Sequence, residues 1–164
     1  MKNLWAPWRM DYIRAPEKEK DCIFCKKIEM DNDQDGLLLY RGENAFVMLN
    51  LYPYNNGHIL IAPYEHVNRT NKLSADCLSE IMELADSSMN ILTKEMNAQG
   101  FNFGANIGSA AGAGIEEHIH FHLVPRWVGD TNFMPILGHT KVQVQGLKET
   151  WTQLQPLFNK LKQG

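Results

Sequence analysis

The segment His118-Ile-His-Phe-His-Leu-Val124 is the most informative part of this chain, because three of its six histidines alternate there with apolar residues. Successive side chains of a β-strand point to opposite faces of the sheet. The three imidazoles therefore share one face, and the apolar residues between them enter the core. A single histidine in this pattern is most simply part of a polar outer face, whereas three in succession indicate a chemical site.

Two kinds of chemistry use a row of imidazoles. A His-x-His pair can bind a metal ion, and a catalytic zinc would need a third ligand and an open position. Alternatively, one neutral imidazole can attack phosphorus while its neighbours orient it and hold the phosphate. The segment from Asn106 to Gly114 directly precedes the strand and is rich in glycine, so its backbone N–H groups can cradle phosphate oxygens. This combination favours phosphoryl chemistry, with Arg126 as a further possible anion contact.

The segments around this strand predict an α+β fold with a mainly antiparallel, five-stranded sheet, because strands follow one another through hairpins or a single helix. Leu78, Ile81 and Ala85 belong to a helical apolar stripe with Ser74 as its N-cap, and Pro156 should kink a second helix. The expected elements are a hairpin over 37–49 with a turn at 42–44, strands over 58–63, 101–107 and 118–127, one long helix over 74–96 and a C-terminal helix over 147–161.

The overall composition is that of a single globular domain. The chain has 164 residues, of which 44% are hydrophobic and 21% charged. We assign 1–21 to an N-terminal aromatic arm and 22–164 to one domain that ends in a loop and a helix. The formal charge of -3 argues against a nucleic-acid partner. The chain has neither an apolar run long enough for a membrane helix nor a signal peptide, so we expect a cytoplasmic protein.

The cysteines suggest a metal site. Cys22 and Cys25 have the spacing of two ligands in a structural zinc site, but four ligands are needed and there is no second cysteine pair. Two unligated thiols are the simpler alternative, and a thioredoxin-like redox motif would need a βαβ context that is missing. Cys77 falls in the long helix, where we expect a small buried residue.

Over most of its length the chain resembles the histidine triad (HIT) family of nucleotide hydrolases and transferases. The resemblance rests on the motif His-φ-His-φ-His-φ-φ, where φ is apolar, and on three longer segments. It also extends to PRWVGDTNFM and WAPWRMDYI, which resemble the bacterial branch that includes diadenosine tetraphosphate phosphorylases (ATP adenylyltransferases). The three longer segments are CIFC from Cys22, LNLYPYNNGHILIAPYEHV from Leu49 and NIGSAAGAGIEEHIHFHLVPRW from Asn106.

The resemblance implies a HIT-like fold and a set of catalytic residues. His120 would be the nucleophile that attacks the α-phosphate of an adenosine polyphosphate, such as diadenosine tetraphosphate, or of a phosphoramidate. Water or phosphate would then release the nucleotide from the nucleotidyl-histidine. His122 would contact the transferred phosphate, His58 would help to orient it, and His118 is the first histidine of the triad. No organic cofactor is implied.

The resemblance also implies a purine nucleotide site. Asn50 would bind the ribose hydroxyls, while Asn106 and the segment from Gly112 to Gly114 would lie over the phosphates. The commonest family pattern has Ala-Gly-Gln before the triad, but here the glutamine is missing and the segment is one residue longer. No residue is therefore assigned to the activation of the leaving group. The positions that match the base pocket, and that are equally suited to an ordinary core, are Ile23, Phe24, Met48, Leu49 and Leu51.

Further implications concern the metal and the subunits. Some relatives complete a structural zinc site with histidines that correspond to His66 and His118. Trp5, Trp8 and Tyr12 of the arm need a surface to pack on, and members of the family are commonly dimers. We therefore expect a homodimer or a higher homo-oligomer, in which the arm covers the partner's surface.

Two alternatives to this enzyme remain at the level of sequence. The missing loop glutamine is compatible with a purine nucleotide-binding module that has weak or phosphoramidate-directed hydrolase activity. A metallohydrolase could instead use all three triad histidines as ligands, although the sequence offers no obvious carboxylate partner for a metal-bound water.

Overall fold

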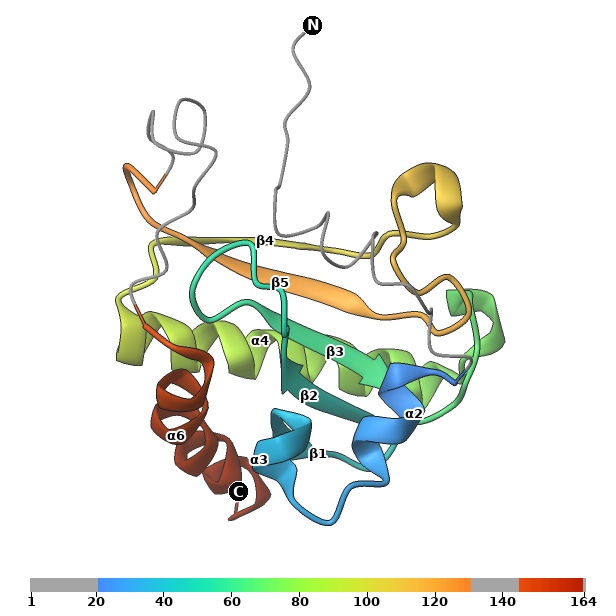
Figure 1. The fold of residues 1–164 in the computed structure, drawn as a ribbon, viewed down its shortest axis with the longest axis horizontal. Helices are drawn as coiled ribbons and strands as arrows, with labels where there is room; N and C mark the ends of the chain where they lie inside the picture. Colours follow the sequence, from blue (N-terminus) through green and yellow to red (C-terminus); the bar gives the residue numbers. More distant parts are fainter. Residues whose placement is uncertain (1–20, 131–144, 164) are drawn as a thin grey trace, which may run out of the picture.

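The computed structural model of the protein describes residues 21–130 and 145–163. They are built around a five-stranded sheet in which every neighbouring pair is antiparallel, in the order β1-β2-β3-β5-β4 (Figure 1). The predicted α+β class and antiparallel sheet are confirmed. The aromatic arm and most of the loop after Arg126 lie outside the described residues. The strands are β1 (Leu38–Arg41), β2 (Ala45–Leu49), β3 (Ile59–Pro63), β4 (Gly100–Gly104) and β5 (Phe121–Arg126).

The two predicted helices are present, as α4 (Ala75–Met96) and α6 (Leu147–Phe158). The hydroxyl of Ser74 caps α4 by accepting a hydrogen bond from the N–H of Cys77 at 3.1 Å. Pro156 lies within α6. Sequence reasoning missed α2 (Ile23–Ile28), α3 (Asp33–Gly36) and the 3₁₀ turns, which are too short to show a helical period. The 3₁₀ turns are η1 (Thr70–Lys72), η2 (Ser109–Ala111) and η3 (Asn159–Gln163).

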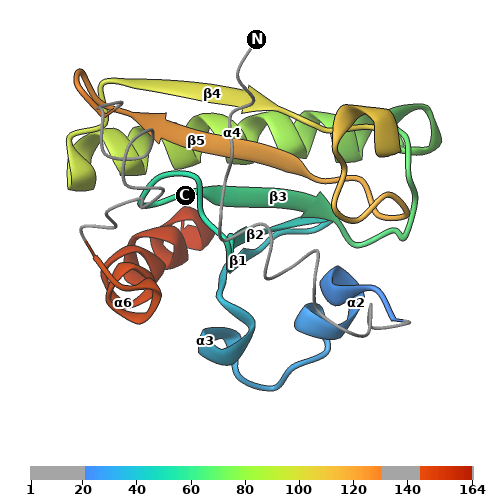
Figure 2. The ribbon, with the colours of Figure 1, turned by 45° about the horizontal axis from the view of Figure 1, so that its top comes forward.

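Each face of the sheet carries a cluster of buried apolar side chains. Helix α4 lies along one face (Figure 2), where Val47, Ile61 and Leu123 join side chains of α4 and α6 in a large buried cluster, here called the helix-side core. On the other face, Phe24 of α2 packs with Phe46, Met48 and other side chains in a smaller cluster, here called the α2-side core. Every residue of β2 and β3 is buried, because each strand contributes to both clusters.

The end of β3 explains why β5 begins at Phe121 and not at His118 as predicted. The ladder between the two strands runs only as far as the pair Ile61 and Phe121. Two residues further along β3 is Pro63, which has no N–H to donate. The N–H of Ile119 instead bonds the carbonyl oxygen of Val67 at 2.6 Å. The alternation of faces continues nevertheless, since Ile119 enters the helix-side core.

Other boundaries differ by a few residues. β3 begins one residue after His58, and β4 occupies 100–104, whereas 101–107 was expected. Within residues 21–130 and 145–163, no helix combines the length and the apolar character needed to cross a membrane.

The turn between β1 and β2 predicts a stabilising role for Glu80 of α4. Its carboxylate accepts hydrogen bonds from the N–H groups of Glu43 and Asn44, at 2.7 and 2.6 Å. An amide has only one acceptor atom, so Glu80→Gln should leave one donor facing an NH₂ group and lower the free energy of unfolding by about 1.5–3 kcal/mol. Urea denaturation measures this loss. The control is Glu83→Gln on the exposed side of the same helix; equal losses in both variants would contradict the assignment.

Candidate functional site

The loop between β2 and β3 determines which ring nitrogen carries the proton in His58 and in His122. The N–H of Tyr54 donates to Nδ1 of His58 at 3.0 Å, so the proton of the neutral His58 ring lies on Nε2. That Nε2 atom is 3.0 Å from Nδ1 of His122 and donates to it. His122 consequently carries its own proton on Nε2. The side chain of His58 thus fixes the tautomer of His122, and its catalytic role stays a prediction.

The middle histidine of the triad has the opposite tautomer. Nδ1 of His120 lies 2.9 Å from the carbonyl oxygen of His118 and can only donate to it. The lone pair of the neutral ring is therefore on Nε2. Burial lowers the pKa of His120, with the hydrogen bond to the backbone opposing that effect, so the ring is neutral at physiological pH. The arrangement leaves an unprotonated ring nitrogen beside His122, whose ring centroid is 5.0 Å away.

Phe24 supports both buried histidines from α2. Its ring centroid lies 5.0 Å from that of His118 and 4.7 Å from that of His120. The phenyl ring and the nucleophile are almost completely buried. The face carrying the triad is therefore also the face carrying the α2-side core.

The residues expected around the base fall into three groups. Phe24 and Met48 belong to the α2-side core, and Ile23 packs against it. Leu51 is half exposed, on the loop after β2. Leu49 enters the helix-side core on the opposite face of the sheet, because it is one position from Met48 and side chains alternate. The structure thus brings Ile23, Phe24 and Met48 to the face of the sheet that carries His120 and does not bring Leu49 there.

Asn50 uses both ends of its amide within the protein. Its Nδ2 lies 3.3 Å from Nδ1 of His58, and its Oδ1 accepts the N–H of Tyr52 at 3.0 Å. In this structure Asn50 helps to hold His58. A contact with ribose hydroxyls stays a prediction.

The glycine-rich segment between β4 and β5 is strongly curved. Gly108 and Gly112 adopt positive φ angles of 83° and 79° on either side of η2, and glycine makes this conformation accessible without strain. Further along, Ile115 packs against the α2-side core, so the segment returns to the face of the triad. Glu116 and Glu117 are exposed, as expected. A role of Asn106, Gly112 and Gly114 in phosphate binding stays a prediction.

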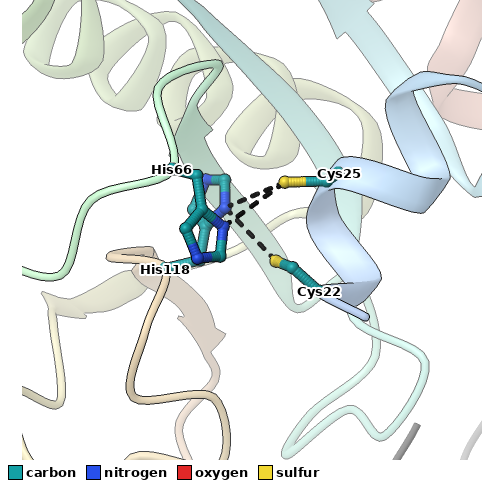
Figure 3. A group of neighbouring side chains, drawn as sticks. All are labelled: Cys22, Cys25, His66 and His118. Carbon is teal, nitrogen blue, oxygen red and sulfur yellow. Dashed lines mark hydrogen bonds between the residues drawn. The ribbon is translucent and has the colours of Figure 1, made fainter. Parts of the chain in front are cut away.

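A candidate metal centre lies beside the triad. The ligand atoms of Cys22, Cys25, His66 and His118 all lie within 4.8 Å of one another (Figure 3). Nδ1 of His118 is 3.3 Å from Sγ of Cys22 and 3.7 Å from Sγ of Cys25, and Nδ1 of His66 is 3.4 Å from Sγ of Cys25. Ligands bound to a tetrahedral zinc at its usual bond lengths are separated by about 3.3–3.8 Å. The four predicted residues therefore form a cluster that can hold a metal ion.

His118 is prepared for this role by a second contact. Its Nε2 donates to the carbonyl oxygen of Pro63 at 2.9 Å, which leaves the lone pair of Nδ1 directed at the two sulfur atoms. The main-chain carbonyl of the same residue accepts the hydrogen bond of His120. The candidate metal centre and the nucleophile are thus joined through one residue.

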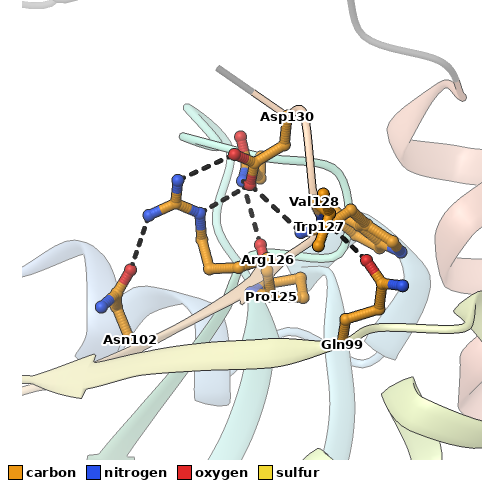
Figure 4. A network of polar contacts seen from close by, with 8 residues as sticks. Gln99, Asn102, Pro125, Arg126, Trp127, Val128 and Asp130 are labelled. Atoms are coloured by element: carbon orange, nitrogen blue, oxygen red, sulfur yellow. Dashed lines mark hydrogen bonds and ion pairs between the residues drawn. The ribbon is translucent and has the colours of Figure 1, made fainter.

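Arg126 is held by groups of the protein, and the anion contact that the sequence suggested stays a prediction. Its guanidinium binds Asp130 through two nitrogens, at 2.6 and 2.8 Å, and donates to Asn102 of β4 at 2.8 Å (Figure 4). The carboxylate of Asp130 also accepts a hydrogen bond from Nδ2 of Asn55 at 2.9 Å.

Sequence reasoning missed Tyr54, Asn55 and Asp130, because only the fold brings a turn before His58 next to the end of β5.

The comparisons with known proteins agree with this geometry. Residues 31–128 match the model of the HIT domain. The chain therefore belongs to the HIT domain family, as predicted.

An AP-4-A phosphorylase of Mycobacterium tuberculosis is 36% identical over 157 residues, which cover 92% of this chain and 80% of that protein. This similarity confirms the prediction of a HIT family enzyme. An adenosine 5'-monophosphoramidase of Schizosaccharomyces pombe is 29% identical over 105 residues, covering 64% of this chain and 74% of that protein.

Solved structures of similar proteins share the fold. A zinc-bound histidine triad family protein from Mycobacterium smegmatis superposes with a TM-score of 0.66 at 22% identity, covering 87% of this chain and 96% of that chain. A histidine triad nucleotide-binding protein from Sulfolobus tokodaii superposes with a TM-score of 0.64 at 27% identity, covering 85% and 90%.

The Arg126–Asp130 pair predicts a pH-dependent contribution to stability. The hydrogen bond from Arg126 lowers the pKa of the Asp130 carboxyl from its ordinary 3.8 to about 2, against the opposing effect of desolvation. A pKa that is lower in the folded state means that the stabilisation is complete above the unfolded value and is lost as the pH falls toward the folded value. Since the Asp130 side chain is 11% exposed but Arg126 is 39% exposed, solvent screening reduces the effect to about 1–2 kcal/mol.

The measurement compares the free energy of unfolding of the wild type with that of Asp130→Asn in urea at several pH values. The wild type should lose its advantage between about pH 4 and about pH 2. A difference that stays constant over this range would contradict the ion pair.

Proposed function

We propose that the protein is a nucleotidyl hydrolase or transferase that cleaves the α-phosphate bond of adenosine polyphosphates, such as diadenosine tetraphosphate, through a covalent AMP-histidine intermediate. One observation carries the proposal: the hydrogen bond from Nδ1 of His120 to the carbonyl oxygen of His118 leaves the Nε2 lone pair of a buried, neutral ring for attack. The similarity to an AP-4-A phosphorylase supports the substrate class.

The first chemical step forms a P–N bond. Nε2 of His120 attacks the α-phosphorus, and the bond from this phosphorus to the bridging oxygen breaks, so that the leaving nucleotide departs with the electron pair. The ring becomes a cation with its proton still on Nδ1. Its hydrogen bond to the carbonyl oxygen of His118 then becomes charge-assisted and stronger, and no base is needed to remove a proton from the nucleophile.

His122 serves the phosphoryl oxygens in this proposal. Because His58 donates to its Nδ1, its proton lies on Nε2, the nitrogen that can donate to an oxygen on which negative charge increases. In the second step, water or phosphate attacks the same phosphorus, a P–O bond forms, and the P–N bond breaks with its electron pair returning to Nε2, which restores neutral His120. The proton that an attacking water loses goes to the solvent. Water yields AMP and phosphate yields ADP.

The ligand atoms of the candidate metal centre suit zinc. Two thiolates and two imidazoles form a common structural set, and three of the distances between their ligand atoms, 3.3, 3.4 and 3.7 Å, match a tetrahedral site. We propose that Cys22, Cys25, His66 and His118 bind a structural zinc ion. When bound, the ion would cross-link α2 to the segment that carries the nucleophile.

A nucleotide-binding module with phosphoramidate-directed activity is the second candidate. The missing loop glutamine and the similarity to an adenosine 5'-monophosphoramidase favour it. The metallohydrolase has less support, because the three triad imidazoles have different partners: His118 is directed at the two cysteines, His120 at a backbone carbonyl and His122 at His58. A homodimer or higher homo-oligomer and a cytoplasmic location stay predictions.

The covalent intermediate can be detected directly. The wild type incubated with diadenosine tetraphosphate should gain the mass of one adenylyl group in intact-mass spectrometry, and His120→Asn should gain none and lose turnover by several orders of magnitude, as expected for a lost nucleophile. AMP alone, which has no leaving nucleotide, serves as the control. Undiminished turnover by His120→Asn would refute the proposed mechanism.

The same reaction separates phosphorolysis from hydrolysis. With phosphate as acceptor, the products of diadenosine tetraphosphate are ADP and ATP, whereas water gives AMP and ATP. Binding of purine nucleotides by calorimetry, with no turnover of polyphosphates or phosphoramidates, would instead support the binding module.

Metal content tests the zinc site. The purified wild type should contain one zinc ion per chain by elemental analysis, and Cys25→Ser should lose most of it because a thiolate ligand is removed. Cys77→Ala, which removes a thiol outside the cluster, is the matched control and should retain the metal. Equal zinc content in both variants would show that the cluster does not bind it.

A further inference from the structure

The loop between β2 and β3 controls the proton position in the pair His58 and His122. The N–H of Tyr54 fixes the His58 tautomer from a distance of 3.0 Å. The ring of Tyr54 also packs against both imidazoles, with centroid distances of 4.8 Å to His58 and 5.9 Å to His122, and it is nearly parallel to the latter at 12°. A displacement of Tyr54 would therefore disturb both histidines at once.

Asn55, the next residue, attaches this loop to the end of β5. Its Nδ2 donates to the carbonyl oxygen of Pro125 and to Oδ2 of Asp130, both at 2.9 Å. Its own carbonyl oxygen accepts the N–H of His58 at 3.1 Å. One side chain thus connects a turn in the first half of the domain to a strand end about 70 positions later.

Asp130 is a rigid anchor for that amide. Both carboxylate oxygens are held by Arg126, and Oδ2 also accepts the N–H of Trp127 at 3.3 Å. Arg126 is held in turn by Asn102 of the neighbouring strand β4 (Figure 4). The carboxylate that Asn55 contacts is therefore held by groups from β4 and from the end of β5.

From these contacts we propose that Asn55 and Asp130 form a clamp that positions Tyr54, and through it the tautomers of His58 and His122, for the reaction proposed above. The two clamp residues are positioning residues and touch no substrate. Without the clamp, the Tyr54 N–H would move away from His58, and Nδ2 of Asn50 would be the donor left at Nδ1 of His58. Once that amide turns its Oδ1 to the ring, Nδ1 of His58 can take the proton. Its Nε2 would then accept from His122, and the Nε2 of His122 would face phosphoryl oxygens with a lone pair in place of a proton.

The consequence is a loss of turnover and not of affinity. His122 in the wrong tautomer repels the charge that increases on the phosphoryl oxygens during attack, whereas Phe24 and Met48, two of the residues expected around the base, belong to the α2-side core and not to the clamp. Asn55→Ala should lower kcat between about 10-fold and about 100-fold, the range typical of a displaced catalytic group, with little change in KM. Asn90→Ala is the matched control, because Asn90 also donates to an aspartate carboxylate but on the exposed face of α4.

A second variant keeps the test informative if Asn55→Ala folds poorly. Asp130→Asn preserves the shape of the anchor but removes its charge, and Asp33→Asn, which breaks the comparable pair with Arg41, is its control. The expected result is a lower kcat in Asp130→Asn and unchanged kinetics in Asp33→Asn.

Nitrogen-15 NMR of the histidine rings supplies a readout that does not depend on turnover. In the wild type, His58 and His122 should both show a protonated Nε2 and an unprotonated Nδ1, and Asn55→Ala or Asp130→Asn should shift this pattern. Folded clamp variants with wild-type kcat and wild-type ring signals would overturn the proposal. If the wild type turns over no polyphosphate, the proposed function fails, while the ring signals still decide whether the clamp positions the histidines.

Discussion

The hydrogen bond from Nδ1 of His120 to the carbonyl oxygen of His118 is the contact on which the site depends. A neutral imidazole has one donor and one acceptor, so committing Nδ1 to a carbonyl leaves the lone pair of Nε2 for attack. Burial keeps the ring neutral by lowering the pKa of His120. The sheet and the α2-side core make this possible, because they hold an otherwise costly buried polar group in one tautomer.

One face of the sheet carries the main apolar core, and the other carries the triad and the candidate metal centre. On the helix side, α4 and α6 cover a large apolar core that holds the strands in register. On the other side, α2 places Phe24 against His118 and His120. The same segment supplies Cys22 and Cys25 to the candidate metal centre. A six-residue helix without a long apolar stripe has little stability of its own. A bound ion would supply the missing attachment, which gives a physical reason for a structural metal at this place.

His118 connects these functions although it is not the proposed nucleophile. Its Nδ1 points at the cysteines, its Nε2 binds Pro63 and its main-chain carbonyl holds His120. His122 is held from the other direction, through His58 and the loop that Asn55 attaches to Asp130. The two histidines that flank the proposed nucleophile are thus held by different contacts.

Much of the architecture could be predicted from local patterns. Period-two alternation identified the triad strand and the face shared by its histidines, and the period of α4 revealed the longest helix. The spacing of Cys22 and Cys25 indicated a metal site, which the resemblance completed with His66 and His118. Such features are visible because each depends on residues within a few positions of one another or on a motif shared with relatives. Short elements such as α2 and α3 fall below the length at which a period is visible.

What the sequence by itself determined was therefore the fold class, the family and the identity of the triad, since alternation and motif spacing are local properties. Only the tertiary structure decided that Leu49 and His120 lie on opposite faces of the sheet, that Arg126 pairs with Asp130, and that Tyr54 and Asn55 hold His58. Arg126 and Asp130 are only four residues apart, as are Tyr54 and His58, but Asn55 reaches Pro125 and Asp130 across 70 and 75 positions. The direction of a donor toward one ring nitrogen depends on how β3 and β5 pair, and no pattern within a single segment contains that geometry.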